Sequence, residues 1–271
     1  MTPVFANSAW VNAPQALIQR EGAWKNVALK VRYGLFRHPD HGAILIDTGY
    51  TRETTQGAHR GRALRLYAKV LKPALNAIHQ PQQFLSHFDL SVDDIKYVIV
   101  THFHADHISG LNQFPNARFI GCGDAFARIR SNSTIRNLSH GVFAELLPKD
   151  FTERFTSLDD LPQSDTAIFD LPTGADLFGD GTVQSIPLPG HAHGHFGVLF
   201  PMEKTPFLYA VDVQWLQSAL QGRPPGFPST LIADDTHQLA ASSDIVAHFQ
   251  SRGGTVVLCH DPSDTPFDIA T

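Results

Sequence analysis

Cysteine is scarce in this chain, and its scarcity limits what can hold the fold together. Only two of the 271 residues are cysteines, Cys122 and Cys259, and both lie in apolar stretches typical of strands. Two cysteines cannot supply the disulfide framework of a small secreted protein, so we expect both to be buried free thiols. A chain of this length must instead be stabilised by an apolar core, for which an apolar content of 42% is sufficient.

Long apolar runs and an excess of basic residues are also missing. No stretch approaches the roughly 18 consecutive apolar residues of a membrane-spanning helix, and residues 1–30 lack the pattern of a signal peptide. We therefore expect a cytoplasmic protein without a membrane partner. The formal net charge of −5 and the absence of a Lys/Arg run argue against nucleic acid as a partner. A small-molecule substrate is the expected partner, and the sequence leaves a homodimer open.

Histidine, in contrast, is abundant, with 15 residues, and several of them cluster. The segment Thr101–His107 places four strong metal-ligand side chains within six positions, directly after an apolar run. Alternate side chains of an extended backbone point the same way, so His102 and His104 can converge on one ion. Asp106 and His107 follow at a different phase, at the expected start of a short helix, and should face a second ion. A lone histidine is usually a surface or core residue, but burying these four together costs desolvation unless an ion or water compensates.

Strand and helix patterns alternate along the chain. The expected strands cover residues 24–37, 43–46, 97–100, 118–122, 182–188, 196–200, 206–213 and 255–259. The expected helices cover residues 60–78, kinked or divided at Pro73, then 124–129, capped by Asp124, and 236–250. This pattern predicts one α/β domain over residues 1–271, with a helical insertion around residues 51–92. That insertion could be a lid, a dimer element or a solvated helix.

Two irregular regions complete this interpretation. His38 and His41 lie in a polar turn between the first two expected strands, where we expect both side chains to be exposed. Residues 131–180 show little periodicity and are rich in Ser, Asp, Thr and Pro. Long irregular segments of this kind are often loops that shape a substrate pocket.

The remaining candidate ligands all follow expected strands. Loops at strand ends gather at one edge of an α/β fold, which is where sites are commonly built. Cys259 should point away from this site, because its side chain alternates with that of its neighbour in a strand. A consistent assignment gives one ion to His102, His104 and His191, and the other to Asp106, His107 and His260, with Asp212 bridging both. Each ion then keeps open positions, as a catalytic site requires.

Together these residues resemble the metallo-β-lactamase superfamily. Asp47, the H-x-H-x-D-H motif, the Gly190-His191 turn, Asp212 and His260 occur in the order and approximate spacing of that family, and the match covers most of the chain. The resemblance implies an αβ/βα four-layer sandwich with a dinuclear zinc centre between the sheet edges, where iron or manganese could also bind. It also implies that Asp47 orients the metal ligands.

Within the superfamily, the chain is most similar to the N-acyl homoserine lactonases, which are quorum-quenching enzymes. The usual G-H-T-P-G-H turn of that group here reads G-H-A-H-G-H, so a proline is lost and His193 is added. We expect His193 to lie at the surface or behind the ligands, and His195 to match the second histidine of that turn. A tyrosine that supports the substrate carbonyl or leaving group is replaced by Trp215. An indole donates one hydrogen bond but is not an acid of comparable strength.

The expected reaction is hydrolysis. Two cations about 3.5–4 Å apart lower the pKa of a shared water, and the resulting metal-bound hydroxide attacks a carbonyl or phosphoryl centre. Asp106 and Asp212 are the expected catalytic carboxylates, with Asp212 placed to accept a proton. A lactone or ester is the first hypothesis, in a pocket lined by Trp215, Phe103 and apolar residues of 60–78.

Three alternatives stay open at this point. A thioester, as in glyoxalase II, or a phosphodiester would suit the same chemistry. An iron-dependent redox reaction is less favoured, although His- and carboxylate-rich sites can hold iron. A metal-binding protein without catalytic activity is disfavoured, because no ligand position is replaced.

Overall fold

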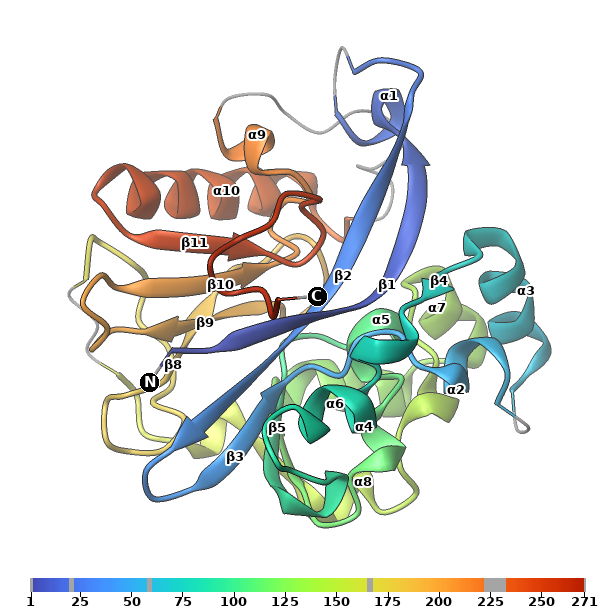
Figure 1. Ribbon diagram of the computed structural model, residues 1–271, viewed down its shortest axis with the longest axis horizontal. Helices are drawn as coiled ribbons and strands as arrows, with labels where there is room; N and C mark the ends of the chain where they lie inside the picture. The colour runs from blue at the N-terminus through green and yellow to red at the C-terminus, as the bar shows by residue number, and fades with distance from the viewer. Residues whose placement is uncertain (1, 20–21, 58–59, 165–167, 222–232, 271) are drawn as a thin grey trace.

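Two β-sheets face each other in the computed structural model of this chain, which describes residues 2–19, 22–57, 60–164, 168–221 and 233–270 (Figure 1). The strands of the described residues are β1 (Val4–Pro14), β2 (Asn26–His38), β3 (Gly42–Ile46), β4 (Ala74–Leu75), β5 (Ile95–Val100), β6 (Arg118–Gly121), β7 (Phe155–Ser157), β8 (Gln184–Pro187), β9 (Phe196–Phe200), β10 (Phe207–Val211) and β11 (Thr255–Leu258). One sheet has the order β4-β1-β2-β3-β5-β6-β7 and the other has the order β11-β10-β9-β8.

Helices cover the outer faces of both sheets. The α-helices of the described residues are α1 (Gln15–Ile18), α2 (Arg52–Thr55), α3 (Arg62–Leu71), α4 (Pro81–Ser86), α5 (Ala105–Ile108), α6 (Gly123–Ser131), α7 (Thr134–Ser139), α8 (Phe151–Arg154), α9 (Gln217–Leu220) and α10 (Thr236–Ser251). Short 3-10 helices lie at η1 (Ala77–His79), η2 (Val92–Asp94), η3 (Leu111–Gln113), η4 (Ala144–Leu146) and η5 (Leu158–Asp160). None of these described helices is long and apolar enough to cross a membrane.

Strand direction brings the important loops to one edge of the molecule. In the larger sheet β3, β5, β6 and β7 are parallel neighbours, so the segments that follow them leave from the same edge. In the smaller sheet β10 is antiparallel to β9 and parallel to β11, and β8 is antiparallel to β9. It follows that β8, β10 and β11 also run in one direction and end at a common edge.

The core divides along β10 into two apolar clusters. Phe207, Tyr209 and Val211 belong to the large cluster between the sheets, whereas Leu208 and Ala210 belong to a second cluster that also contains residues of α10. This alternation is the period of two that a strand buried on both faces requires. Helix α10 therefore packs on the outer face of the smaller sheet, and α4, α5, α6 and α8 contribute side chains to the large cluster beside the other sheet (Figure 1).

Strand β1 was not among the strands that the sequence predicts. It pairs with β2, with a register shift between Asn7 and Trp10. At this irregularity the Asn7 Oδ1 atom accepts the Val31 N–H at 2.8 Å, and the buried Ser8 hydroxyl donates to the Val31 carbonyl at 2.9 Å. These buried polar side chains interrupt the apolar pattern from which a strand is recognised. All the expected strands are present, the one over 196–200 with the expected ends and the rest with shifted ends.

The expected helix over residues 60–78 is shorter than its apolar spacing indicates. Helix α3 ends at Leu71, and Lys72 takes a left-handed conformation with φ of 47° before Pro73. Proline excludes the helical conformation of the residue before it and lacks an N–H of its own, so the helix stops. The following residues form β4, which pairs with β1, and then η1.

Two further expectations of local structure were wrong. His38 is buried rather than exposed, because the loop around Phe178 folds over the turn: the two rings lie 4.8 Å apart, and His38 Nε2 lies 3.0 Å from Asp180. His41 is half-buried against the same phenylalanine. Helix α6 begins before Asp124, which lies in its first turn instead of capping it.

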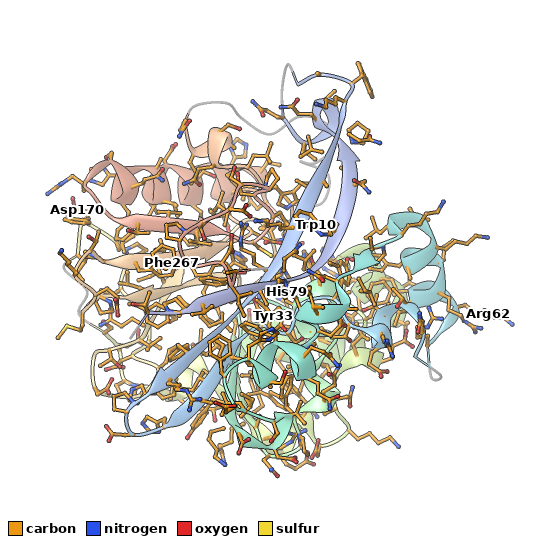
Figure 2. The ribbon with its side chains drawn as sticks, viewed as in Figure 1. Trp10, Tyr33, Arg62, His79, Asp170 and Phe267 are labelled. Atoms are coloured by element: carbon orange, nitrogen blue, oxygen red, sulfur yellow. The ribbon has the colours of Figure 1, made fainter. Side chains whose placement is uncertain are left out.

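Some buried polar groups of the core are paired with backbone groups of distant segments. Tyr33 on β2 illustrates this, since its fully buried hydroxyl donates to the His79 carbonyl at 2.9 Å (Figure 2). Both cysteines are free, as expected; Cys259 is buried and Cys122 is partly buried.

Candidate metal centre

The predicted ligands meet where the strand ends of the two sheets face each other. His102 and His104 follow β5, and Asp106 and His107 lie in the first turn of α5. The other three come from the smaller sheet, after β8, β10 and β11: His191, Asp212 and His260. All seven side chains are buried or nearly so.

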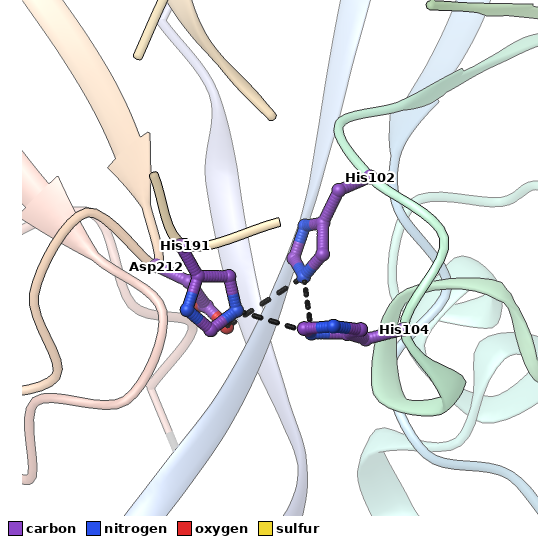
Figure 3. Close-up of side chains that lie close together, drawn as sticks. All are labelled: His102, His104, His191 and Asp212. Atoms are coloured by element: carbon purple, nitrogen blue, oxygen red, sulfur yellow. Dashed lines mark hydrogen bonds and ion pairs between the residues drawn. The ribbon is translucent and has the colours of Figure 1, made fainter. Parts of the chain in front are cut away.

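One group of donor atoms is formed by three histidines and Asp212 (Figure 3). The His104 Nδ1 atom lies 3.0 Å from His102 Nε2 and 3.1 Å from His191 Nε2. Asp212 Oδ2 lies 3.2 Å from His191 Nε2 and 3.8 Å from His102 Nε2. These are the residues that the sequence assigns to one ion.

A second group shares the same Asp212 oxygen. Asp212 Oδ2 lies 3.2 Å from His260 Nε2 and 3.4 Å from His107 Nε2. Asp106 Oδ2 lies 3.4 Å from His260 Nε2 and 3.6 Å from His107 Nε2. Asp212 is thus the one side chain of the described residues that stands in both groups.

The two groups fit metal ions in spacing and in chemistry. A tetrahedral zinc with ligands at about 2.0–2.1 Å places its donor atoms about 3.3 Å apart, close to the separations found here. Two polar atoms in the described part of the chain support this: His107 Nε2 and Asp212 Oδ1 are buried and lack a hydrogen-bond partner. A buried polar atom without a partner is costly, and a cation would satisfy both.

Asp47 lies behind the second group, where it holds His107. Its Oδ2 atom accepts from His107 Nδ1 at 2.8 Å and from the Thr101 hydroxyl at 2.8 Å, and its Oδ1 atom accepts the Thr101 N–H at 2.9 Å. This leaves His107 Nε2 facing the site. Complete burial raises the pKa of Asp47, against the opposing influence of His107 and the Thr101 hydrogen bonds.

Backbone conformation next to two of these carboxylates is unusual. Asp47 has a φ of 60°, and Val211, immediately before Asp212, has a φ of 54°. A β-branched residue in this region is an outlier that the surrounding structure must enforce. The Val211 carbonyl, at the end of β10, accepts the N–H of Cys259, the residue after β11, at 2.9 Å. The strained residue thus lies directly before Asp212, whose carboxylate faces both ligand groups.

His195 fixes the other side of Asp212. Its Nδ1–H donates to the Leu188 carbonyl at 2.7 Å, so Nε2 is free to accept the Asp212 N–H at 3.2 Å. Burial, followed by the charge of His191, lowers the pKa of His195 to about 3. The neutral ring is the only form that can make both hydrogen bonds. The residue expected from the family turn therefore acts on the backbone of Asp212.

The histidines of the two groups differ in their electrostatics. Burial and neighbouring histidines lower the pKa of His102, and burial and His191 lower that of His104 to about 3. His107 and His260 have raised pKa values, because Asp106, Asp47 and Asp212 outweigh their burial. His260 is oriented by its Nδ1–H, which donates to the Lys30 carbonyl at 2.7 Å.

The structure agrees with the expected position of His193 and contradicts that of Cys259. His193 lies at the surface, as expected, and pairs with Asp124. Cys259 does not point away from the site as expected: its Sγ atom belongs to a set with His107, Asp212 and His260 whose ligand atoms lie within 4.8 Å of one another. The reason is that β11 ends at Leu258, so strand alternation no longer holds at Cys259. Its thiol donates to the Arg32 carbonyl at 3.4 Å.

A cavity of about 460 Å³ opens onto both groups. Trp215, Tyr67 and Leu71 line it, as the sequence predicts for Trp215 and the apolar residues of 60–78. Phe103 does not line this cavity, because its ring is buried against Phe126 at 6.2 Å between centroids. The irregular region 131–180 also lines the cavity, through the end of α7 and the residues that follow it, 138–141.

Comparison with known families agrees with this geometry. Residues 29–240 match the family model of the metallo-beta-lactamase superfamily. The chain belongs to this superfamily. As a metallo-beta-lactamase superfamily member with His/Asp metal-site clusters, it is a metallo-hydrolase related to the N-acyl homoserine lactonases.

Several curated relatives of this superfamily member carry that lactonase name. The N-acyl homoserine lactonase AttM of Azorhizobium caulinodans is 27% identical over 261 residues, which cover 91% of this chain and 87% of the relative. The N-acyl homoserine lactonase AiiB of Rhizobium rhizogenes is 30% identical over 179 residues, or 65% of this chain and 60% of the relative. A probable metallo-hydrolase of Mycobacterium tuberculosis is 26% identical over 194 residues, or 68% of this chain and 57% of the relative.

Solved structures share the fold. A variant of AiiA from B. thuringiensis, with N-decanoyl-L-homoserine bound at the active site, has a TM-score of 0.70 at 16% identity and covers 97% of this chain and 95% of its own. AidC, a dizinc quorum-quenching lactonase in complex with a product, has a TM-score of 0.59 at 16% identity and covers 89% and 76%. The expected metallo-beta-lactamase fold, an α/β sandwich of two mixed sheets with helices, is confirmed.

The sequence pattern missed part of the cavity of this superfamily member. Val11 and Leu29, on β1 and β2, line it, and so does Ile18 on α1. Tyr50 lines it too, beside Tyr67. The apolar spacing of 60–78 includes Tyr67 but says nothing of its hydroxyl, and no pattern pairs it with Tyr50. The β1 residues were missed because that strand was missed.

The low pKa of His195 predicts a pH-dependent stability. Its pKa of about 3 in the folded protein lies below the value of about 6.5 expected for the unfolded chain. Between these values the unfolded state binds the proton, so the contribution of His195 to stability falls as the pH falls below about 6.5, by about 1.4 kcal/mol per pH unit. Denaturant unfolding of metal-free wild type and His195→Asn at pH 7, 6 and 5 should show the steeper loss in wild type. Parallel curves would contradict this role.

Proposed function

We propose that this metallo-hydrolase opens a lactone or ester that carries an apolar acyl group. The observation that carries the proposal is the cavity itself, which joins the two ligand groups to an apolar wall made by Ile18, Leu29 and Trp215. A mostly apolar pocket with a few convergent polar groups is typical of sites for small molecules. The relatives named N-acyl homoserine lactonase support the same substrate class.

The ligand assignment from the sequence is proposed for this site. His102, His104 and His191 would hold one cation, Asp106, His107 and His260 the other, and Asp212 both. Zinc is the preferred metal, because tetrahedral sites of histidine and carboxylate suit it, with iron or manganese as alternatives. When bound, two such cations supply Lewis acidity that polarises a carbonyl and lowers the pKa of water.

The side chains of this chain contribute charge and position. Asp106 and Asp212 carry the negative charge of the site, since His107 and His260 hold the pKa of both carboxyls down against burial, to about 2 for Asp106. The Asp212 carboxylate, which stands in both ligand groups, would accept a proton from the attacking water. His195 and Asp47 hold Asp212 and His107 in place for this task.

The charge of the cavity favours an ester over a phosphodiester. Of the described residues that line it, none is a lysine or an arginine, and both Asp106 and Asp212 face it. Apart from the proposed metal ions and the site histidines, an anionic phosphodiester would therefore meet carboxylates without a lysine or arginine to pair with. A neutral lactone or ester, with its apolar group against Trp215, avoids that cost.

The test is a substrate panel with a matched pair of tryptophan variants. We expect kcat/KM to rise with acyl-chain length on lactones and aryl esters, and to be negligible on a phosphodiester. Trp215→Ala should raise KM about tenfold for the long chain, because lost apolar contact of this kind weakens binding by about 1–2 kcal/mol. Trp24→Ala is the control, since Trp24 is 81% exposed. Phosphodiester cleavage without ester or lactone hydrolysis would overturn the proposal.

A further inference from the structure

A phenol from another element occupies the cavity of this enzyme. The resemblance to the lactonases places a tyrosine where this chain has Trp215, so the usual phenol is missing at that position. Two tyrosines nevertheless line the cavity together with Asp106, Asp212 and His260. They are Tyr50, in the loop after β3, and Tyr67, on α3.

Helix α3 presents Tyr67 inward. Leu64 is buried in the core, whereas Leu66 and Val70 are 63% and 70% exposed. Positions 64, 67 and 71 recur on one helix face, and Leu71 lines the cavity with Tyr67. The Tyr67 ring also packs against Phe143 at 4.8 Å between centroids. The side chain is therefore fixed in the cavity wall.

Tyr50 controls the direction of the Tyr67 hydroxyl. The Tyr50 backbone is held by its N–H, which donates to the Ser8 hydroxyl at 2.9 Å, and by its carbonyl, which accepts from Gln80 Nε2 at 3.2 Å. Its own hydroxyl is buried and is hydrogen-bonded to the Tyr67 hydroxyl. Tyr50 is the more deeply buried of the two, so satisfying both groups favours donation from Tyr50 to Tyr67. The Tyr67 proton then remains free for a ligand, and the incoming hydrogen bond strengthens it as a donor.

We propose that Tyr67 replaces the missing phenol and donates a hydrogen bond to the leaving-group oxygen of the lactone or ester, an inference that rests on the proposed function. Water adds its oxygen to the acyl carbon, and the carbon–oxygen bond of the ester breaks with its electron pair on the leaving oxygen. The proton that this oxygen finally carries comes from the water. Tyr67 keeps its own proton throughout and stabilises the charge that develops on the leaving oxygen.

The electrostatics of the cavity are consistent with a donor that stays protonated. Burial and the carboxylates of Asp106 and Asp212 raise the pKa of Tyr67. The phenol therefore keeps its proton at neutral pH. Trp215 lies elsewhere in the wall, with its ring 5.8 Å from that of His260.

The kinetic test compares leaving groups. Removing one oxyanion-type donor costs about 10²-fold or more, so Tyr67→Phe should lower kcat about 10²-fold on a lactone or alkyl ester with little change in KM. An activated aryl ester, whose leaving oxygen needs little stabilisation, should lose less than about threefold by the same argument. Tyr33→Phe is the matched control, since it removes a buried phenol that donates to the His79 carbonyl outside the cavity. It should leave the lactone-to-aryl-ester ratio unchanged, and metal content should be equal in all proteins.

A binding test does not depend on turnover. N-acyl homoserine carries the oxygen that left, and N-acyl 2-aminobutyrate lacks it. By calorimetry, Tyr67→Phe should weaken binding of the first about threefold to tenfold, as for one neutral hydrogen bond, and leave the second unchanged. In addition, Trp215→Tyr should add little to wild type but restore lactone hydrolysis to Tyr67→Phe.

The outcomes separate this inference from the proposed function. Equal losses on both ester types, or equal weakening of both ligands, would show a merely structural role and overturn the inference. An active lactonase that is unaffected by Tyr67→Phe would overturn it while leaving the proposed function in place. A wild type that neither opens lactones or esters nor binds N-acyl homoserine would overturn both.

Discussion

Asp212→Asn is expected to reduce hydrolysis by on the order of 10³-fold, the scale of losing an acid–base group, and to lower metal content below that of wild type. Asp212 Oδ2 lies within 3.2–3.8 Å of nitrogen atoms from four histidines, and Oδ1 is buried without a partner among the described residues. An amide has the same shape but no charge, so it can neither balance two cations nor accept the proton of the attacking water. Activity per bound metal and elemental analysis are the measurements.

Asp176→Asn is the matched control for this variant. Asp176 is also buried and uses its carboxylate to accept the N–H groups of Phe178, Gly179 and Gly181, beside the turn of His38 and away from the ligands. We expect it to lower stability while leaving metal content and activity per metal unchanged. If the two variants lost metal and activity equally, Asp212 would have no special place in the site.

Removal of the metal is the second change with a large expected effect, in this case on thermal stability. Protein purified without chelator should hold close to two metal equivalents per chain, and chelation should lower Tm by about 10 °C. The estimate follows because a ligand at 1,000 times its Kd stabilises by about 4 kcal/mol, and each kcal/mol moves Tm by about 2–4 °C at this size. Without cations, His107 Nε2 and Asp212 Oδ1 stay buried and unpaired.

Restoring metal provides the control for the chelation experiment. Readdition of zinc should recover both Tm and activity, whereas magnesium, which prefers octahedral oxygen ligands, should not. A reproducible content near one equivalent would contradict the dinuclear assignment. A Tm that does not change on chelation would contradict the view that these buried groups need a cation.

The clustering of the candidate ligands could be predicted because its signal is local and topological. His102, His104, Asp106 and His107 are close in sequence, and strand direction alone places His191, Asp212 and His260 at a common edge. The orientation of those side chains could not be predicted in the same way. It depends on hydrogen bonds between distant segments, such as Asp47 with His107 and His195 with Asp212, and on the strained Val211.

The cavity walls were harder to predict than its base. Strand β1 was not predicted because Asn7 and Ser8 interrupt its apolar pattern. Both are buried polar residues that hydrogen-bond to the backbone of Val31 on β2, a role that only the tertiary structure shows. Helix α3 was recognised by its apolar spacing, but its end depends on the left-handed Lys72 before Pro73. Cys259 was misplaced because the rule of alternation was extended one residue past the end of β11.

The division of the ligands between the two sheets has a mechanical consequence. His102, His104, Asp106 and His107 come from the larger sheet, and His191, Asp212 and His260 come from the smaller one. A cation held by both groups would act as a staple between segments far apart in the chain, and cross-links that close long loops restrict the unfolded chain most. The two cysteines of this protein are free. Its metal centre would therefore supply the long-range cross-link that disulfides supply in secreted proteins.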